Sequence, residues 1–482
     1  MEENNIRKLT REAELRVVSA FLKGKLPEAV DRIPLEMCPA TEQQAGRCCV
    51  YKGRAIAKYR VMAVLGFGID DETDELTPLA EYAHEAQARE KVSSRILSVI
   101  TPACSSCPQA RFYVSDACRG CTAHPCQANC PKHCVSIVGG KAELDAGKCV
   151  NCGRCQKVCP FHAIIHLSLP CEESCPVGAI SKDEHNKVNV DFSKCIYCGR
   201  CITACPFGAV VERSQLLDVL RALRSGRRVY ALAAPAIAGQ WEGGLPRIVS
   251  ALMALGFHAV KEVAAGADAA ARLEAEEFLE RGRRGLPFMT TSCCQAYMQA
   301  VQKVLPEIRP FVSGTPSPLQ LMAKGVKADD PERIAVFIGP CIAKRRESMD
   351  SAFVDYYLTF SEVDALFEAS GIKVPAQPEA RLEAPARREG RGFPLAGGVL
   401  AAVVSHLPRG FEAPPVCVNG LNKASIKQLR AYAAGGCPAR LVEVMACEGG
   451  CINGPDVVAA PAKAKERLAC VLDGSGTAYD GA

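Results

Sequence analysis

Two cysteine runs carry the clearest chemistry in this sequence. Both follow the spacing C-x2-C-x2-C-x3-C-P, one over Cys149 to Pro160 and the other over Cys195 to Pro206. Three thiolates at this spacing wrap one [4Fe-4S] cluster, and the fourth reaches the other cluster of a pair. The runs therefore predict iron-sulphur clusters, which by themselves conduct electrons.

The two runs belong to an internal repeat with a period of about 45 residues. Crossed ligation within this repeat predicts three sets of ligands: Cys118, Cys121, Cys126 and Cys159; Cys130, Cys149, Cys152 and Cys155; and Cys175, Cys195, Cys198 and Cys201. A fourth set is short of two ligands, because Ala163 and His166 stand where the first copy has Cys118 and Cys121. If this set exists, it consists of Cys104, Cys107, Cys171 and Cys205. We expect three or four accessory clusters, with Cys134 left over.

Five further cysteines lie in three C-terminal segments that each follow an apolar run: Cys293, Cys294, Cys341, Cys447 and Cys451. Cys293 and Cys294 are adjacent and cannot both point at one cluster from regular structure, so one thiol is spare. On a helix, Cys447 and Cys451 would face the same way, and Gly449 and Gly450 would let a bulky inorganic group approach the backbone.

The spare thiol has a chemical use. With an unperturbed pKa of ~8.5, a thiol beside a redox centre is suited to giving and taking protons near neutral pH. The alternative is one more [4Fe-4S] cluster with an idle cysteine. That alternative leaves unexplained the basic Lys344, three residues beyond Cys341.

The elements around these segments alternate between apolar runs and amphipathic runs. We expect strands over residues 229–233, 259–263 and 334–338 and a helix over residues 246–255, which together indicate an α/β domain with parallel strands. Sites in such domains lie where a strand turns into a helix. The cysteine distribution divides the chain into a mainly helical region (1–100), tandem α+β cluster domains (101–212) and the α/β domain (213–482).

Composition and charge exclude several classes of function. With 48% apolar and 23% charged residues, and a net charge of only +5 over 482 residues, nucleic-acid binding is not expected. The first 26 residues carry charges throughout, so we expect no signal peptide and a cytoplasmic protein whose 28 cysteines are reduced. The longest apolar stretch, Tyr230 to Gly239, is shorter than the ~20 residues of a membrane span. Membrane insertion is not expected either.

Residues 104 to 205 resemble tandem two-cluster ferredoxin domains. The three C-terminal segments resemble the three signature motifs of the [FeFe]-hydrogenases, or iron-only hydrogenases, over roughly Val229 to Cys470. The resemblance implies a two-lobed α/β domain with parallel sheets flanked by helices. It also implies the H-cluster, a [4Fe-4S] cube linked through one cysteine sulphur to a diiron unit that carries CO, cyanide and a bridging dithiolate.

Carried over position by position, the resemblance assigns roles to single residues. The cube ligands would be Cys294, Cys341, Cys447 and Cys451, the last also bridging to the diiron unit. Cys293 would be the proton donor, and Lys344 would hold a cyanide by a charge-assisted hydrogen bond. Met445 and Phe393 would pack against the diiron unit.

The resemblance also implies a proton path. Ser313 lies twenty residues beyond Cys293, and Glu274 and Glu277 lie three apart on a predicted helix. Glu347 matches the acidic end of the second motif. Taken singly, a Ser or Glu on a surface helix is more often just a solvated residue. The spacing of all these residues together matches the family's pattern, and this favours a proton relay.

Four positions depart from the family's pattern. Gln295 stands where a Pro is usual, Gly339 where a Met is usual, and Ala236 where a Ser is frequent. Asn453-Gly454-Pro455 replaces further glycines and a Gln. Every ligand remains, but such neighbours tune metal sites by roughly ten- to a hundredfold. The pattern is most similar to the group B monomeric enzymes of anaerobic bacteria.

The predicted function is the reversible reduction of protons to hydrogen, with a ferredoxin or similar carrier supplying electrons through the accessory clusters. The enzyme is expected to be a monomer loaded by hydrogenase maturation proteins. The alternative is a non-catalytic relative, acting as a redox or hydrogen sensor or as an iron-sulphur assembly factor. Cys293, Lys344 and the relay carboxylates favour the enzyme.

Overall fold

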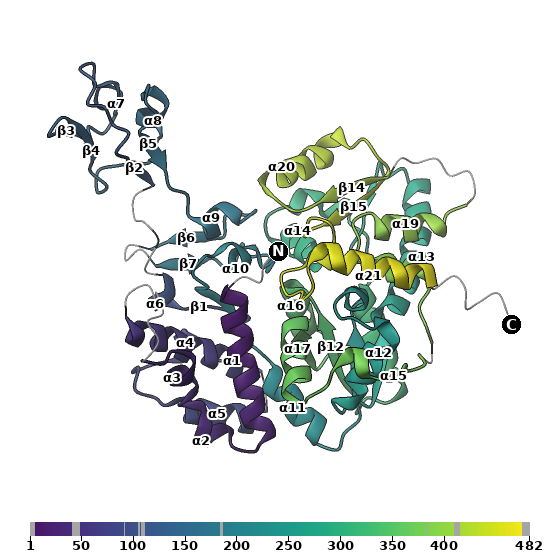
Figure 1. Cartoon of the computed structure of the whole chain (residues 1–482). Helices are drawn as coiled ribbons and strands as arrows, with labels where there is room; N and C mark the ends of the chain where they lie inside the picture. Colours follow the sequence, from purple (N-terminus) through teal and green to yellow (C-terminus); the bar gives the residue numbers. More distant parts are fainter. Residues whose placement is uncertain are drawn as a thin grey trace.

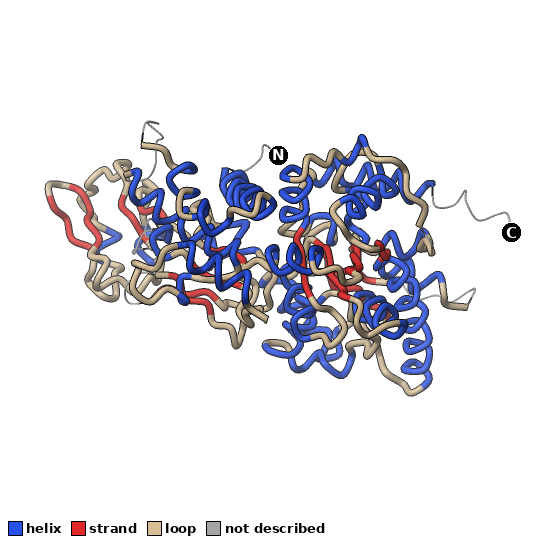
Figure 2. Tube along the Cα trace, turned by 90° about the horizontal axis from the view of Figure 1, so that it is seen from below, coloured by secondary structure: helices blue, strands red, loops and turns tan. Residues whose placement is uncertain are grey.

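The computed structural model describes residues 5–40, 49–90, 92–104, 107, 111–183, 187–382, 384–408 and 415–474. Within these ranges the chain forms a helical N-terminal region, a cluster region of short strands and helices, and a larger α/β region (Figure 1, Figure 2). In the part of the chain so described, no helix combines the length and apolarity needed to span a membrane.

Five helices make up the N-terminal region: α1 (Asn5–Leu22), α2 (Leu26–Val30), α3 (Ile33–Met37), α4 (Val50–Leu65) and α5 (Leu79–Ala88). α1 ends at Leu22, two residues before Gly24, which takes a positive φ of 68°. α1 packs against α4 and against α17 (Phe360–Ala369) of the α/β region. The N-terminal helices are therefore attached to the α/β region by direct packing.

The cluster region consists of antiparallel strand pairs joined by short helices. The pairs are β1 (Leu97–Val99) with β8 (Val210–Glu212), β2 (Phe112–Val114) with β5 (Ile164–His166), β3 (Val135–Val138) with β4 (Lys141–Leu144), and β6 (Ile180–Lys182) with β7 (Val188–Val190). The helices are α6 (Thr101–Cys104), α7 (Pro125–Ala128), α8 (Arg154–Val158), α9 (Pro170–Ser174) and α10 (Arg200–Ala204). Residues 111–167 project from the body of the molecule as a distal module (Figure 1). The predicted α+β character of this region is confirmed.

The α/β region contains two parallel sheets, as expected for a two-lobed domain. One has the order β10-β9-β12-β13, formed by β9 (Val229–Ala233), β10 (Ala259–Glu262), β12 (Ile334–Gly339) and β13 (Tyr356–Thr359). The other has the order β11-β15-β14, formed by β11 (Met289–Thr290), β14 (Val416–Asn419) and β15 (Leu441–Met445). Every pairing within the two sheets is parallel.

Helices surround both sheets (Figure 2). They are α11 (Leu216–Arg224), α12 (Gly244–Ala254), α13 (Val263–Arg283), α14 (Gln295–Lys303), α15 (Pro318–Asp329), α16 (Ile342–Asp350), α17, α18 (Arg388–Gly392), α19 (Gly398–Ser405), α20 (Lys423–Ala431) and α21 (Pro461–Gly474). β9, β12 and β15 are buried along their whole length. The continuous apolar sequences of β9 and β12 suit strands covered on both faces, as parallel sheets require, whereas β15 is apolar except for Glu443.

The strand pair β1 and β8 connects the two ends of the cluster region. Leu97 pairs with Glu212 and Val99 with Val210, and the amide of Ile100 donates to the carbonyl of Ala209. This pairing brings α6, which carries Cys104, beside the end of the second cysteine run at Cys205. The contact is between residues about a hundred positions apart, so local spacing alone could not have indicated it.

Candidate active site and cluster sites

The three C-terminal motifs meet where strands of the two sheets end. Cys294 lies between β11 and α14, Cys341 lies between β12 and α16, and Cys447 and Cys451 follow β15. The expectation that these sites lie at strand ends is confirmed. Burial, together with the neighbouring thiols, raises the pKa of Cys341 and Cys447 above the ordinary value and that of Cys451 to about 12.

The segment from Cys447 to Cys451 is a turn and not a helix, so the helical arrangement considered for these two cysteines does not occur. Gly449 and Gly450 have φ angles of 82° and 96°, and only the residues from Cys451 to Asn453 form a short 3-10 helix. A side chain at Gly450 would place its Cβ 2.3 Å from the carbonyl oxygen of Pro394. The glycine is required because two backbone segments approach each other there, which holds the 393–399 segment against the third motif.

The donor set at this site fits an iron-sulphur cluster. Four partly buried thiols from three separate segments make up this set: Cys294, Cys341, Cys447 and Cys451. The pKa values of Cys341, Cys447 and Cys451 are raised in part by the neighbouring thiols of the set, and soft thiolates are the ligands that iron-sulphur clusters use. Among the described residues, no three His, Cys, Asp or Glu side chains converge closely enough for a single metal ion.

Cys293 lies on the side of the site that holds the acidic residues. It packs against the same apolar cluster as Phe393 and Met445, both of which are buried. Burial, followed by the charge of Glu274, raises the pKa of Cys293 well above the ordinary thiol value. The expectation of an unperturbed pKa was therefore wrong, because it ignored the loss of hydration around the thiol.

Glu274 is a buried carboxyl on α13 with only 2% of its surface exposed. Both the backbone N–H of Ser292 (2.9 Å) and its hydroxyl (3.2 Å) donate to Glu274 Oε1. Burial nevertheless dominates and raises the pKa of Glu274 to about 7. Glu274 is therefore not a solvated surface residue. Sequence reasoning missed Ser292, although its position directly before the paired cysteines was a usable signal.

Glu277 lies one turn further along α13 and is partly exposed. The Ser313 hydroxyl donates to Glu277 Oε2 at 2.6 Å, and the backbone N–H of Gly314 donates to Oε1 at 2.9 Å. Arg281 pairs with Glu277 at 2.7 Å near the surface. These donors outweigh burial and lower the pKa of Glu277. The structure thus brings Glu274, Glu277 and Ser313 together, with the pKa of one carboxyl raised and that of its neighbour lowered.

Lys344 is paired with Glu347, one turn along α16. The Nζ to Oε2 distance is 2.5 Å, and the Ser317 hydroxyl donates to the other oxygen of Glu347. Burial by itself would lower the pKa of Lys344, but the carboxylate of Glu347 raises it. The ammonium group therefore stays charged inside the site. Glu347, predicted as part of the relay, holds Lys344 in this structure.

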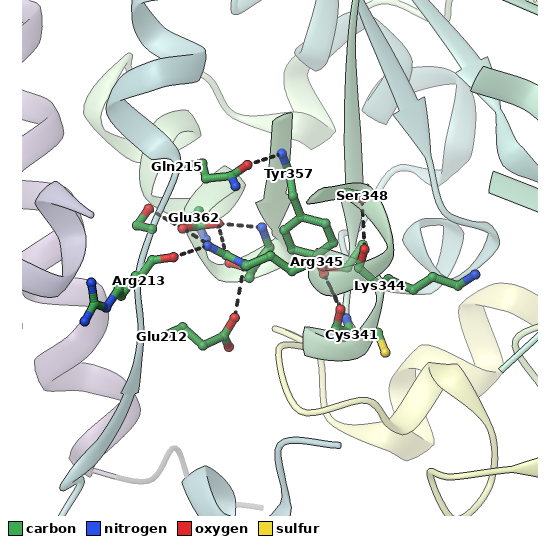
Figure 3. A network of polar contacts seen from close by, with 12 residues as sticks. Glu212, Arg213, Gln215, Cys341, Lys344, Arg345, Ser348, Tyr357 and Glu362 are labelled. Atoms are coloured by element: carbon green, nitrogen blue, oxygen red, sulfur yellow. Dashed lines mark hydrogen bonds and ion pairs between the residues drawn. The ribbon is translucent and has the colours of Figure 1, made fainter. Parts of the chain in front are cut away.

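Arg345 anchors α16 from the other side and was missed by sequence reasoning. Only 1% of its side chain is exposed, and it pairs with Glu362 at 3.2 Å and Glu212 at 3.3 Å (Figure 3). Its guanidinium lies over the Tyr357 ring. The Tyr357 hydroxyl donates to backbone carbonyl groups and accepts the amide N–H of Cys341 at 3.0 Å. Arg345 and Tyr357 thus position the backbone of a predicted ligand.

Gly339 is explained by packing. A Cβ at this position would approach the Phe337 ring to 2.8 Å. The departure from the family pattern here is therefore matched by a neighbouring aromatic ring on the same strand. The structure gives no comparable reason for Gln295.

The predicted accessory ligands gather in four places. One hollow is lined by all members of the first set, Cys118, Cys121, Cys126 and Cys159. A second hollow is lined by the second set and by one more thiol: Cys130, Cys149, Cys152, Cys155 and Cys134. Burial and the charges of Cys198, Cys195 and Cys175 raise the pKa of Cys201, so the four members of the third set lie close together. Burial and the charges of Cys205, Cys107 and Cys104 raise the pKa of Cys171, so the structure also brings the fourth set together.

The third set lies next to the hydrogenase-like site. The ionisation of Cys447 is affected by Cys198. A Cβ at Gly199 would meet Ile342 at 2.6 Å and Pro455 at 2.9 Å, so α10 packs closely on both motifs. The cluster region therefore ends against the predicted cube ligands.

Comparison with known families agrees with this arrangement. Residues 227–455 match the model described as iron only hydrogenase large subunit, C-terminal domain. The C-terminal domain belongs to the iron-only hydrogenase family. Residues 169–209 match a 4Fe-4S dicluster domain, and residues 142–165 match a 4Fe-4S binding domain.

The curated proteins to which this chain is similar differ in their named roles. It is 28% identical over 371 residues to the periplasmic [Fe] hydrogenase large subunit of Nitratidesulfovibrio vulgaris, covering 65% of this chain and 85% of that protein. It is 26% identical over 282 residues to the cytosolic iron-sulfur assembly component 3 of Pongo abelii, covering 46% and 59%. A solved [FeFe]-hydrogenase structure matches with 22% identity and a TM-score of 0.46, covering 53% of this chain and 88% of that one.

Proposed function

We propose that this chain is an [FeFe]-hydrogenase that interconverts protons, electrons and hydrogen. The observation that carries the proposal is the position of Cys293, which interacts with both the predicted cube ligands Cys294 and Cys451 and the buried carboxyl of Glu274. A site that only holds a cubane needs no such thiol with a connected acid.

In this proposal the H-cluster is held by Cys294, Cys341, Cys447 and Cys451, and it supplies the redox chemistry when bound. The chain supplies the protons. Glu277 exchanges them near the surface, Ser313 and Glu274 pass them inward, and Cys293 holds them at its Sγ atom. Lys344 presents a charged N–H donor toward the site, kept protonated by Glu347.

An infrared spectrum of the full chain, produced together with hydrogenase maturation proteins, tests the proposal. Bound CO and cyanide absorb in a region free of protein bands, and the proposal requires such bands together with hydrogen turnover. A chain that carries iron-sulphur clusters but shows no such bands after maturation would be the non-catalytic relative.

The proposed electron route runs from the distal module to the cube. We include a fourth accessory cluster because Cys104 and Cys107 lie beside Cys171 and Cys205. The route then passes through the first and second sets in residues 111–167, the fourth and third sets nearer the body, and finally Cys198 and Cys447.

The distal module has the surface of an electron-carrier docking site. Six exposed apolar side chains lie on it: Tyr113, Val138, Val150, Phe161, Ile165 and Leu167. Residues 111–167 contain seven Lys and Arg against three Asp and Glu, a net charge of +4. Lys132 and Lys157 are exposed and form no ion pair with a described residue. We therefore propose an acidic carrier, such as a ferredoxin, as the partner.

Reversing the charge of this surface should weaken carrier-dependent turnover. In Lys132→Glu/Lys157→Glu we expect the KM for an acidic ferredoxin to rise on the order of tenfold at low salt. At high salt the KM values of this variant and of wild type should differ less, because salt screens the surface charges. Turnover with a small dye should stay unchanged, because the dye does not need the docking surface. Lys465→Glu, on α21 of the hydrogenase domain, is the matched control. Equal effects of the two variants would place the docking site elsewhere.

Because Glu274 titrates near neutral pH, the unfolding free energies of wild type and Glu274→Gln should depend differently on pH. The folded-state pKa of about 7 lies above the ordinary value of 4.5, so the folded chain keeps a proton that the unfolded chain releases. As pH rises from about 4.5 to 7, the unfolding free energy of wild type should therefore fall relative to the variant, by roughly 3 kcal/mol at most.

Glu274→Gln should also lower hydrogen evolution by about 10²-fold, since an amide cannot pass on a proton. Glu276→Gln, on the solvent side of the same helix, is the control for both measurements. A Glu274→Gln variant with wild-type turnover and the same pH profile of stability would remove Glu274 from the relay.

A further inference from the structure

Cys134 is the one cysteine of the distal module that the four ligand sets do not use. It is buried, it lines the hollow of the second set, and its Sγ atom lies 3.3 Å from Sγ of Cys130. This hollow is lined by five thiols, whereas the hollow of the first set is lined by four. The second cluster site therefore has one thiol more than a [4Fe-4S] cluster requires.

The repeat shows what is unusual about this thiol. In four places a Cys-Pro pair is followed, four residues after the cysteine, by a buried residue whose backbone N–H donates to that cysteine's sulphur. The donors are Ala163 to Cys159 (3.4 Å), Ala179 to Cys175 (3.2 Å), Ala209 to Cys205 (3.4 Å) and Cys134 to Cys130 (3.3 Å). Three of the four donors are alanine. Cys134 occupies the position that alanine has in the other three places, and it differs from alanine by the thiol on its Cβ.

We propose that Cys134 is a reserve ligand of the second accessory cluster. Cys130 is the resident ligand, because it corresponds in the repeat to Cys175, and the sulphur of Cys134 lies close enough to bind the same iron in its place. This inference rests on the proposed cluster at this site. It adds that the cluster can change one ligand without being lost.

The exchange needs no oxidant or reductant. The iron–sulphur bond to Cys130 breaks, a bond from the same iron to Cys134 forms, and the proton of the Cys134 thiol passes to the sulphur of Cys130. The two sulphur atoms are already in contact distance, so the backbone need not move far. The surrounding side chains, including Phe112 and Cys155, are buried and keep both thiols directed at the hollow.

The test is a set of single variants in the full chain, with iron content and the electron paramagnetic resonance of the reduced clusters as readouts. Cys130→Ala should keep its cluster, with an altered spectrum because the ligand has changed. Cys134→Ala should keep the cluster with the wild-type spectrum. Cys130→Ala/Cys134→Ala should lose one cluster, or about four irons per chain.

The second copy of the repeat provides the matched control. Cys175→Ala has only Ala179 at the reserve position, so it should lose its cluster, and adding Ala179→Cys to it should restore one. The inference is overturned if Cys130→Ala loses as much iron as Cys175→Ala, or if Cys134→Ala is the variant that loses the cluster. If wild type itself lacks a cluster in the distal module, the proposed electron route fails, which the wild-type spectrum shows separately.

Discussion

Replacing Cys293 with alanine should lower the rate of hydrogen evolution by about 10²- to 10⁴-fold while leaving the CO and cyanide bands of the cofactor in place. The thiol is the group that connects Glu274 with the predicted cofactor ligands, and alanine can neither donate nor accept a proton. Because the side chain packs in an apolar cluster with Phe393 and Met445, alanine should be tolerated there. Infrared spectra and hydrogen assays of the same preparation provide the measurement.

Two variants separate the proton donor from the ligand. Cys293→Asp restores a titratable group at shorter reach and should recover part of the activity. Cys294→Ala should lose the cube, because one iron is then left without its protein thiolate. If the two alanine phenotypes are exchanged, so are the two roles. Full turnover in Cys293→Ala would disprove the relay.

The raised pKa of Cys293 changes how this thiol is understood. A thiol that resists ionisation supplies little thiolate near pH 7, and in the proposed relay it would hold a proton at its Sγ atom. In the proposed relay, Glu274, whose pKa is about 7, would set the pH at which the thiol is reprotonated.

Arg345→Met should destabilise the fold by about 3–5 kcal/mol, the usual effect of removing one partner of a buried ion pair. The arginine is fully enclosed, and its loss leaves the carboxylates of Glu362 and Glu212 without their cation. Chemical denaturation followed by circular dichroism measures the change. The infrared bands should also broaden, because Tyr357 and the backbone of Cys341 lose their support on α16.

Arg346→Met is the matched control on the next residue. Arg346 pairs with Asp350 at the surface, where such pairs contribute ~0–1 kcal/mol. In Arg345→Met/Glu362→Gln the loss of stability should be smaller than in Arg345→Met, since one buried charge is removed with its partner. Equal unfolding free energies for Arg345→Met and Arg346→Met would show that the buried network does not stabilise the domain.

Much of the architecture could be predicted from local sequence patterns. Apolar runs such as residues 229–233 indicated parallel strands, and the structure contains them in two parallel sheets with the motifs at their ends. The spacing of the cysteine runs grouped most of the accessory thiols, and the structure brings each group together, while their binding of clusters stays a prediction. These features depend on residues a few positions apart, where chain geometry leaves few alternatives.

Other features were decided only by tertiary structure. The repeat left open whether Cys104 and Cys107 join Cys171, and the pairing of β1 with β8 across about a hundred residues brings them together. Burial, which no local pattern reveals, raises the pKa of Cys293 and makes Arg345 an internal cation.

The turn at Gly450 follows from the approach of residues 394–396. By itself, then, the sequence determined which residue types lie at each strand end and in each cysteine run. Packing between distant segments determined their hydration and their partners, since ionisation and long-range contacts depend on what the rest of the chain places around a side chain.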